Sequence, residues 1–63
     1  MNPKLQALMT GWKQLAAGLS DCTENEVLEM LEFEKRGKRR RDHLVRLHQR
    51  YTALRASRER REF

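Results

Sequence analysis

Residues 30–54, MLEFEKRGKRRRDHLVRLHQRYTAL, decide the fold that this sequence predicts. Large apolar side chains recur through the stretch at the three- and four-residue spacing of one helix face. Six positions share this heptad frame: Met30, Phe33, Leu44, Leu47, Tyr51 and Leu54. The frame crosses Gly37 without a change of phase, and the stretch contains no proline. We therefore predict one long helix over residues 24–60, with these six side chains along its apolar seam.

Gly37 is the position at which this long helix could end. Lys35 and Arg36 suit the last turn of a helix, where cationic side chains interact favourably with the helix dipole. A glycine kept inside the helix costs only about 1 kcal/mol relative to alanine. A break would normally reset the apolar frame, so we favour a continuous helix. Its start is marked by Thr23 and Glu26, which have the spacing of a capping box.

A shorter apolar stripe precedes the long one. Its members follow the same helical spacing: Leu5, Leu8, Trp12, Leu15 and Leu19. Asn2 is a suitable N-cap, and Pro3 occupies the first helical position, where its missing N–H costs nothing. We predict a helix over residues 3–17, with Trp12 as its main core side chain, followed by a polar turn over residues 18–23.

The two predicted helices differ greatly in length. At about 1.5 Å per residue, the first is about 22 Å long and the second is more than about 50 Å long, so a hairpin of the two leaves part of the long seam uncovered. A soluble monomer rarely exposes so many large apolar groups in one strip. The sequence thus predicts an all-α helical hairpin, a single small domain that dimerises through the long helix. Residues 61–63 are expected to fray.

The small size of the chain also favours association. It has 63 residues and one cysteine, Cys22. A domain of this size buries only about 60% of the surface of its unfolded chain, and one cysteine cannot form an internal disulfide. Oligomerisation is the remaining way to add buried surface. The lone cysteine and the lack of a signal peptide or of a long apolar run predict a cytoplasmic protein outside the membrane.

Charge is distributed unevenly along the chain, which has a net charge of +5. Residues 21–34 carry six carboxylates and no cationic side chain, whereas residues 35–63 carry twelve lysines and arginines against three carboxylates. The basic half favours anionic partners. The acidic segment could equally neutralise the basic half of a second, antiparallel copy.

The sequence lacks the parts of an enzyme. His43 and His48 are five residues apart, which places them on different sides of a helix and not at the i, i+4 spacing of helical metal ligands. Cys22 has no base at a recognisable spacing and is better interpreted as a small buried side chain. The sequence contains no glycine-rich phosphate loop. We predict a non-enzyme without a metal, cofactor or small-molecule ligand.

The strongest functional signal is a basic stripe on the long helix. At 100° per residue, five side chains project along one face, roughly 90° around from the apolar seam: Arg36, Arg39, His43, Arg46 and Arg50. Tyr51 adjoins the stripe, and tyrosine with arginine is typical of interface anchors. These six residues are the predicted partner-binding site. Such a stripe suits a nucleic-acid-binding helix, a helix that grips an acidic protein surface, the charged flank of a coiled-coil dimer, or an ordinary solvated face.

Residues 21–60, DCTENEVLEMLEFEKRGKRRRDHLVRLHQRYTALRASRER, resemble small helical proteins encoded in the early regions of Mu-like temperate phages. Some proteins of that kind are anti-activators that bind a host transcription regulator or a pilus-assembly ATPase. The resemblance implies a regulatory protein that inhibits or modulates a host protein. We rank a protein partner first. A nucleic-acid-binding helical dimer is second, because the basic tract favours it but the acidic segment and the absence of a helix-turn-helix pattern weaken it. A structural assembly subunit is third.

Overall fold

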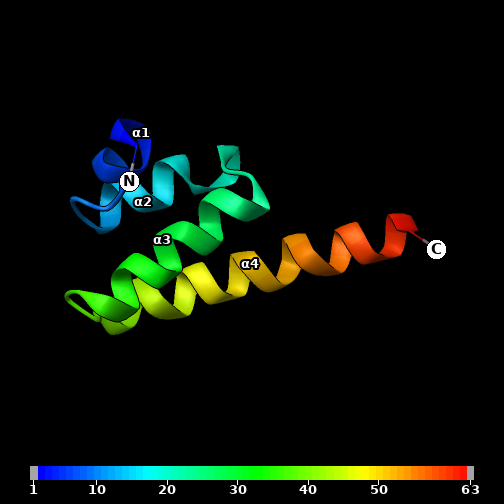
Figure 1. Ribbon diagram of the computed structural model, residues 1–63. Helices are drawn as coiled ribbons and strands as arrows, with labels where there is room; N and C mark the ends of the chain where they lie inside the picture. Colours follow the sequence, from blue (N-terminus) through cyan, green and yellow to red (C-terminus); the bar gives the residue numbers. More distant parts are fainter. Residues whose placement is uncertain (1, 63) are drawn as a thin grey trace.

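The computed structural model describes residues 2–62 as an all-α protein (Figure 1). Over this range it contains four α-helices, one short 3-10 helix and no strand. The elements are, in chain order, α1 (Pro3–Leu8), α2 (Trp12–Gly18), η1 (Leu19–Asp21), α3 (Glu24–Arg36) and α4 (Arg41–Glu62). The predicted all-α class is confirmed, but each of the two predicted helices is divided in two.

The predicted helix over residues 3–17 is interrupted after Leu8. The hydroxyl of Thr10 donates a hydrogen bond to the carbonyl of Ala7 at 2.7 Å, and an extended Gly11 then precedes α2. Two short helices therefore replace one. Leu5, Leu8, Leu15 and Leu19 of the predicted apolar stripe still reach the core, whereas Trp12 does not.

Both predicted helix starts are confirmed. The side-chain oxygen of Asn2 accepts a hydrogen bond from the N–H of Leu5 at 2.9 Å. At the start of α3, the Thr23 hydroxyl accepts from the N–H of Glu26 at 3.2 Å, and the Glu26 carboxylate accepts from the N–H of Thr23 at 2.9 Å. Lys4 Nζ also donates to Glu26 at 3.3 Å and so joins α1 to α3. The hydrogen bonds from the Thr23 backbone and from Lys4 hold the pKa of Glu26 below its ordinary value.

The predicted continuity of the helix through Gly37 is wrong. α3 ends at Arg36 and α4 begins at Arg41, so the chain reverses and α4 packs back along α3 (Figure 1). In the connection, Arg39 adopts a left-handed conformation with a φ of 52°, and its N–H donates to the carbonyl of Glu34 at 2.9 Å. Folding back lets the apolar seam of α4 be buried within one chain. A heptad frame cannot detect such a break when the connection preserves its phase.

An ion pair between the buried Glu34 and the partly buried Arg40 fixes the connection between α3 and α4. The Glu34 carboxylate, 1% exposed, accepts hydrogen bonds from three groups of Arg40: the backbone N–H at 2.7 Å, Nε at 3.1 Å and Nη2 at 2.8 Å. Arg40 Nη2 also donates to the carbonyl of Met9 at 3.0 Å, just after the end of α1. Arg40 therefore ties the start of α4 to both α3 and α1. Its hydrogen bonds outweigh desolvation and hold the pKa of Glu34 below its ordinary value of 4.5.

The core lies where α1, α2 and η1 cover one side of the α3–α4 pair. Its buried apolar side chains are Leu5, Met9, Leu15, Leu19, Cys22, Val27, Met30, Leu31 and Leu47. Four partly buried side chains pack against this cluster: Leu8, Leu44, Tyr51 and Leu54. Most of the predicted seam residues therefore contribute to a core that is formed within a single chain.

Trp12 and Phe33 are not in the core, contrary to the prediction. Trp12 is 47% exposed and Phe33 is 51% exposed. The break before α2 turns Trp12 outward, and Met9 is buried instead. The prediction that Phe33 lies in the seam assumes one continuous helix. Once the chain reverses, Leu31 and Glu34 are the buried side chains near the end of α3, and Phe33 is left toward solvent.

α4 is longer than α3, and its C-terminal end extends beyond the start of α3 (Figure 1). Arg58 Nε donates to the Glu24 carboxylate at 2.8 Å, which holds the two helices together at this end. The helix continues to Glu62, and the fraying expected of residues 61–63 stays a prediction. Phe63, the last residue of the predicted tail, lies outside the described residues.

Candidate functional site

The predicted basic stripe is not continuous in the structure. Arg36 ends α3 and Arg39 lies in the connection, so neither shares a helix with the other members. His43 is only 5% exposed, and its ring centroid lies 5.8 Å from that of Trp12 in an edge-to-face arrangement. It is therefore a core side chain. Arg46 is exposed on α4.

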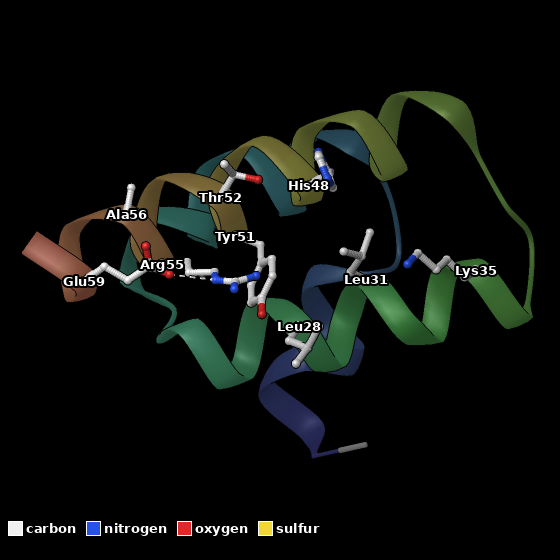
Figure 2. Close-up of a pocket in the computed structure, with 9 residues that line it drawn as sticks. All are labelled: Leu28, Leu31, Lys35, His48, Tyr51, Thr52, Arg55, Ala56 and Glu59. Carbon is white, nitrogen blue, oxygen red and sulfur yellow. Dashed lines mark hydrogen bonds and ion pairs between the residues drawn. The ribbon is translucent and has the colours of Figure 1, made fainter.

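Arg50 and Tyr51 are adjacent in the sequence but face different elements. Arg50 faces η1, where its Nη2 donates to the carbonyl of Ser20 at 3.4 Å. Tyr51 is half-buried and points from α4 toward α3 (Figure 2). The six residues predicted to bind a partner therefore do not form one surface.

Tyr51 lies in a groove that runs between α3 and α4. Figure 2 shows one part of it, in which Tyr51 lies near Leu28 and Leu31 of α3. A second part continues toward the α3–α4 connection and shares Leu31, Lys35 and His48 with the first. We call the whole the α3–α4 groove. It is lined by Leu28, Leu31, Lys35, Arg39, Leu44, Val45, His48, Gln49, Tyr51, Thr52, Arg55, Ala56 and Glu59.

The floor of the α3–α4 groove is apolar. Leu31 is nearly fully buried, and Leu28, Leu44 and Tyr51 are partly buried, so each presents some apolar surface to the hollow. Val45 adds a side chain that is 47% exposed. The lining comes from α3, α4 and their connection, with none from α1, α2 or η1.

The polar rim of the groove is mainly basic. Lys35 and Arg39 lie toward the connection, and His48 and Arg55 lie on α4. The single carboxylate in the lining, Glu59, accepts a hydrogen bond from Arg55 Nε at 3.0 Å (Figure 2). The groove therefore combines an apolar floor with an excess of positive charge.

Ion pairs distinguish the arginines that hold the fold from those that do not. Three arginines pair with carboxylates of the chain: Arg40 with Glu34 at 2.8 Å, Arg55 with Glu59 at 3.0 Å and Arg58 with Glu24 at 2.8 Å. Among the described residues, seven others have no carboxylate partner: Arg36, Arg39, Arg41, Arg46, Arg50, Arg60 and Arg61. Arg36, Arg39 and Arg41 surround the α3–α4 connection, which makes that end of the molecule strongly basic.

The other reactive side chains belong to the interior. The Cys22 thiol donates to the carbonyl of Gly18 at 3.5 Å, and burial raises its pKa, which keeps it protonated and poorly reactive. Neither ring nitrogen of His43 has a hydrogen-bond partner in the described part of the chain. Residues 2–62 hold no group of three or more potential metal ligands. Over the same range, no helix is long and apolar enough to cross a membrane.

Of the six predicted partner-binding residues, only Arg39 and Tyr51 line this groove, because the prediction places α3 and α4 in one helix. A signal was nevertheless present. Leu28, Leu31 and Lys35 have the i, i+3, i+7 spacing of a stripe beside the main apolar frame. This stripe lies opposite His48 and Tyr51 only because the chain reverses after α3.

Comparison with known proteins identifies no relative. No family model matches the chain, and no curated protein or solved structure is significantly similar to it. The resemblance to phage proteins therefore stays a prediction, and the function is argued from the geometry of this chain.

Proposed function

We propose that this chain is a non-enzymatic regulatory protein that binds another protein through the α3–α4 groove and thereby inhibits or modulates it. The observation that carries the proposal is the apolar floor of the groove, which no part of residues 2–62 covers. An uncovered apolar strip rimmed by polar side chains is typical of protein-binding surfaces. Two packed helices also form the ridges against which a third helix can pack.

The polar groups of the groove suit binding better than catalysis. His48 lies on the exposed side of α4, and the one carboxylate of the lining, Glu59, is held by Arg55. A catalytic site needs a base within reach of a reacting group in a concave, water-excluding pocket. The long groove instead offers a surface suited to a helix or an extended segment.

The kind of partner follows from the resemblance noted above. It implies a host protein such as a transcription regulator or an ATPase, which places the protein in the cytoplasm. The buried, reduced Cys22 is compatible with that compartment.

Homodimerisation through α4 remains a second proposal. Its original basis was an uncovered seam, but Leu47 is now buried within the chain, and Leu44, Tyr51 and Leu54 are partly covered. The groove is the apolar surface that a second copy would still have to cover. Light scattering on the eluting protein at tens of micromolar tests this: a mass of 7.6 kDa means one chain, and twice that mass means a dimer.

Nucleic-acid binding is favoured by one specific observation, the basic end formed around the connection. Arg36, Lys38, Arg39 and Arg41 are all exposed there. If they contact phosphates, affinity for duplex DNA must fall steeply with salt, because each neutralised phosphate releases condensed counterions. A titration at two salt concentrations tests this, and binding that vanishes at physiological salt would mean only generic attraction.

The test of the main proposal compares two variants that each add one carboxylate. Leu28→Glu places it in the groove, and Ala17→Glu places it on an exposed position of α2. We expect the wild type and Ala17→Glu to capture the same partner from a lysate of the source cells, and Leu28→Glu to lose it. Circular dichroism must show that both variants are folded. Equal capture by both folded variants would contradict the proposal.

A further inference from the structure

We infer that the α3–α4 groove takes an amphipathic helix of another protein whose apolar stripe is flanked by carboxylates. This inference rests on the proposed function and names the chemistry of the partner. It is carried by the juxtaposition, in one groove, of an apolar floor and a rim on which the cations left unpaired within residues 2–62, Lys35 and Arg39, lie toward the α3–α4 connection.

The shape of the groove fits one helix. Its lining on α4 extends from Leu44 to Glu59, which corresponds to about 22 Å at about 1.5 Å per residue, or about four helical turns. Leu31 lies in both parts of the groove, with Leu28 and Tyr51 on one side of it and Leu44 on the other. An incoming helix can therefore place side chains at i, i+3, i+4 and i+7 along this floor.

The positive charge of the rim determines which side chains should flank the apolar stripe of that helix. Lys35 on α3 and His48 on α4 face the groove from its two sides, and both lie in the segment shared by its two parts. Arg39 adds a guanidinium group that has no carboxylate partner in the described chain. Carboxylates on both sides of the incoming apolar stripe would meet Lys35 and Arg39 on one side and a ring N–H of His48 on the other, whereas a basic or neutral helix would leave the two cations unpaired.

The same charges disfavour a second copy as the occupant. Groove-to-groove pairing would bring two basic rims together, and like charges placed opposite each other across an interface oppose binding. The carboxylates Glu29 and Glu32 line a different hollow on α3, together with Phe33. They therefore do not neutralise the basic rim when two grooves face each other.

A synthetic peptide provides a direct probe. It consists of leucine at i, i+3, i+4 and i+7 and glutamate elsewhere, carries a fluorescent label, and is read by anisotropy against the whole chain. We expect saturable binding that weakens with added salt. Lys35→Gln and Arg55→Gln should each weaken binding about two- to fivefold, as expected for exposed ion pairs, and Leu28→Glu should abolish it. Lys13→Gln on α2 removes the same charge away from the groove and should leave binding unchanged.

Several results would overturn the inference. A scrambled peptide of the same composition could bind equally well, Lys13→Gln could weaken binding as much as Lys35→Gln, or the wild type could form a dimer that Leu28→Glu dissociates. The wild type could also bind duplex DNA more tightly than the peptide, and Lys35→Gln and Arg55→Gln could lose that preference. This result would likewise overturn the inference. If a cellular partner is captured through the groove but the acidic peptide does not bind, only this inference fails. If both tests fail, the proposed function fails as well.

Discussion

At the scale of single residues, Leu47 and Val45 show which side of α4 faces the core. Leu47 is fully buried, whereas Val45 is 47% exposed. Leu47→Ala is expected to lower the free energy of unfolding by about 3 kcal/mol, because it removes buried methyl groups and leaves a cavity. Val45→Ala should cost much less. Urea titrations followed by circular dichroism measure both, and equal losses would contradict the orientation of α4.

Glu34 gives the fold a dependence on pH. Its pKa is depressed in the folded chain, so the folded state binds this proton less tightly than the unfolded state does. The stabilisation is therefore complete above the ordinary pKa of 4.5 and is lost as the pH falls through the folded-state pKa. Glu34→Gln should lower the free energy of unfolding by about 2 kcal/mol at neutral pH, because it weakens charged hydrogen bonds to Arg40. It should also flatten the loss of stability in acid.

Glu26→Gln is the matched control for this pH dependence. Glu26 also accepts hydrogen bonds from a cation and from a backbone N–H, but at the surface. The pKa of Glu26 is also depressed, but solvent screens its ion pair with Lys4, so its removal should change stability less and most of the acid-induced loss seen in the wild type should persist. If the two glutamine variants have the same acid profile, the buried pair between Glu34 and Arg40 is not its main cause.

Among the elements, the connection between α3 and α4 contains one residue with a strained backbone, and this strain can be tested. Arg39 has a φ of 52°, which costs a side-chain-bearing residue about 1 kcal/mol or more relative to glycine. Arg39→Gly should therefore raise the free energy of unfolding by up to about 1 kcal/mol. Lys38→Gly, at an adjacent exposed position without a positive φ, should lower it by a few tenths of a kcal/mol. Thermal unfolding of both variants tests this, and a loss of stability in both would remove the strain argument.

The helix starts could be predicted from the sequence, but the breaks could not. Asn2, Thr23 and Glu26 act through hydrogen bonds within one turn, and such local signals are visible in the sequence. The reversal after Arg36 depends instead on Arg40, whose guanidinium bonds Glu34 and the carbonyl of Met9. That second contact joins residues far apart in the chain, so no local pattern reveals it.

At the scale of the whole molecule, these breaks changed the candidate binding surface more than the core. Most predicted seam residues remain in or beside the core, because burial depends mainly on apolar character and helical spacing. The predicted basic stripe requires one unbroken helix. Because the chain reverses after Arg36, the members of the stripe lie on different elements. Of the predicted site residues, Arg39 and Tyr51 line the α3–α4 groove. Lys35, His48 and Arg55 also line it, although no local sequence pattern groups them with Tyr51.

The proposed function assigns the binding of another protein to the α3–α4 groove, and this claim can be tested directly. The most direct measurement replaces Thr52, an exposed residue of the groove, with a photo-cross-linking amino acid in the cells that make the protein. The same replacement at Ala17, which is exposed on α2, is the control. We predict a discrete covalent adduct with another protein from position 52 and none from position 17. An adduct from position 17 alone, or equal adducts from both positions, would contradict the claim.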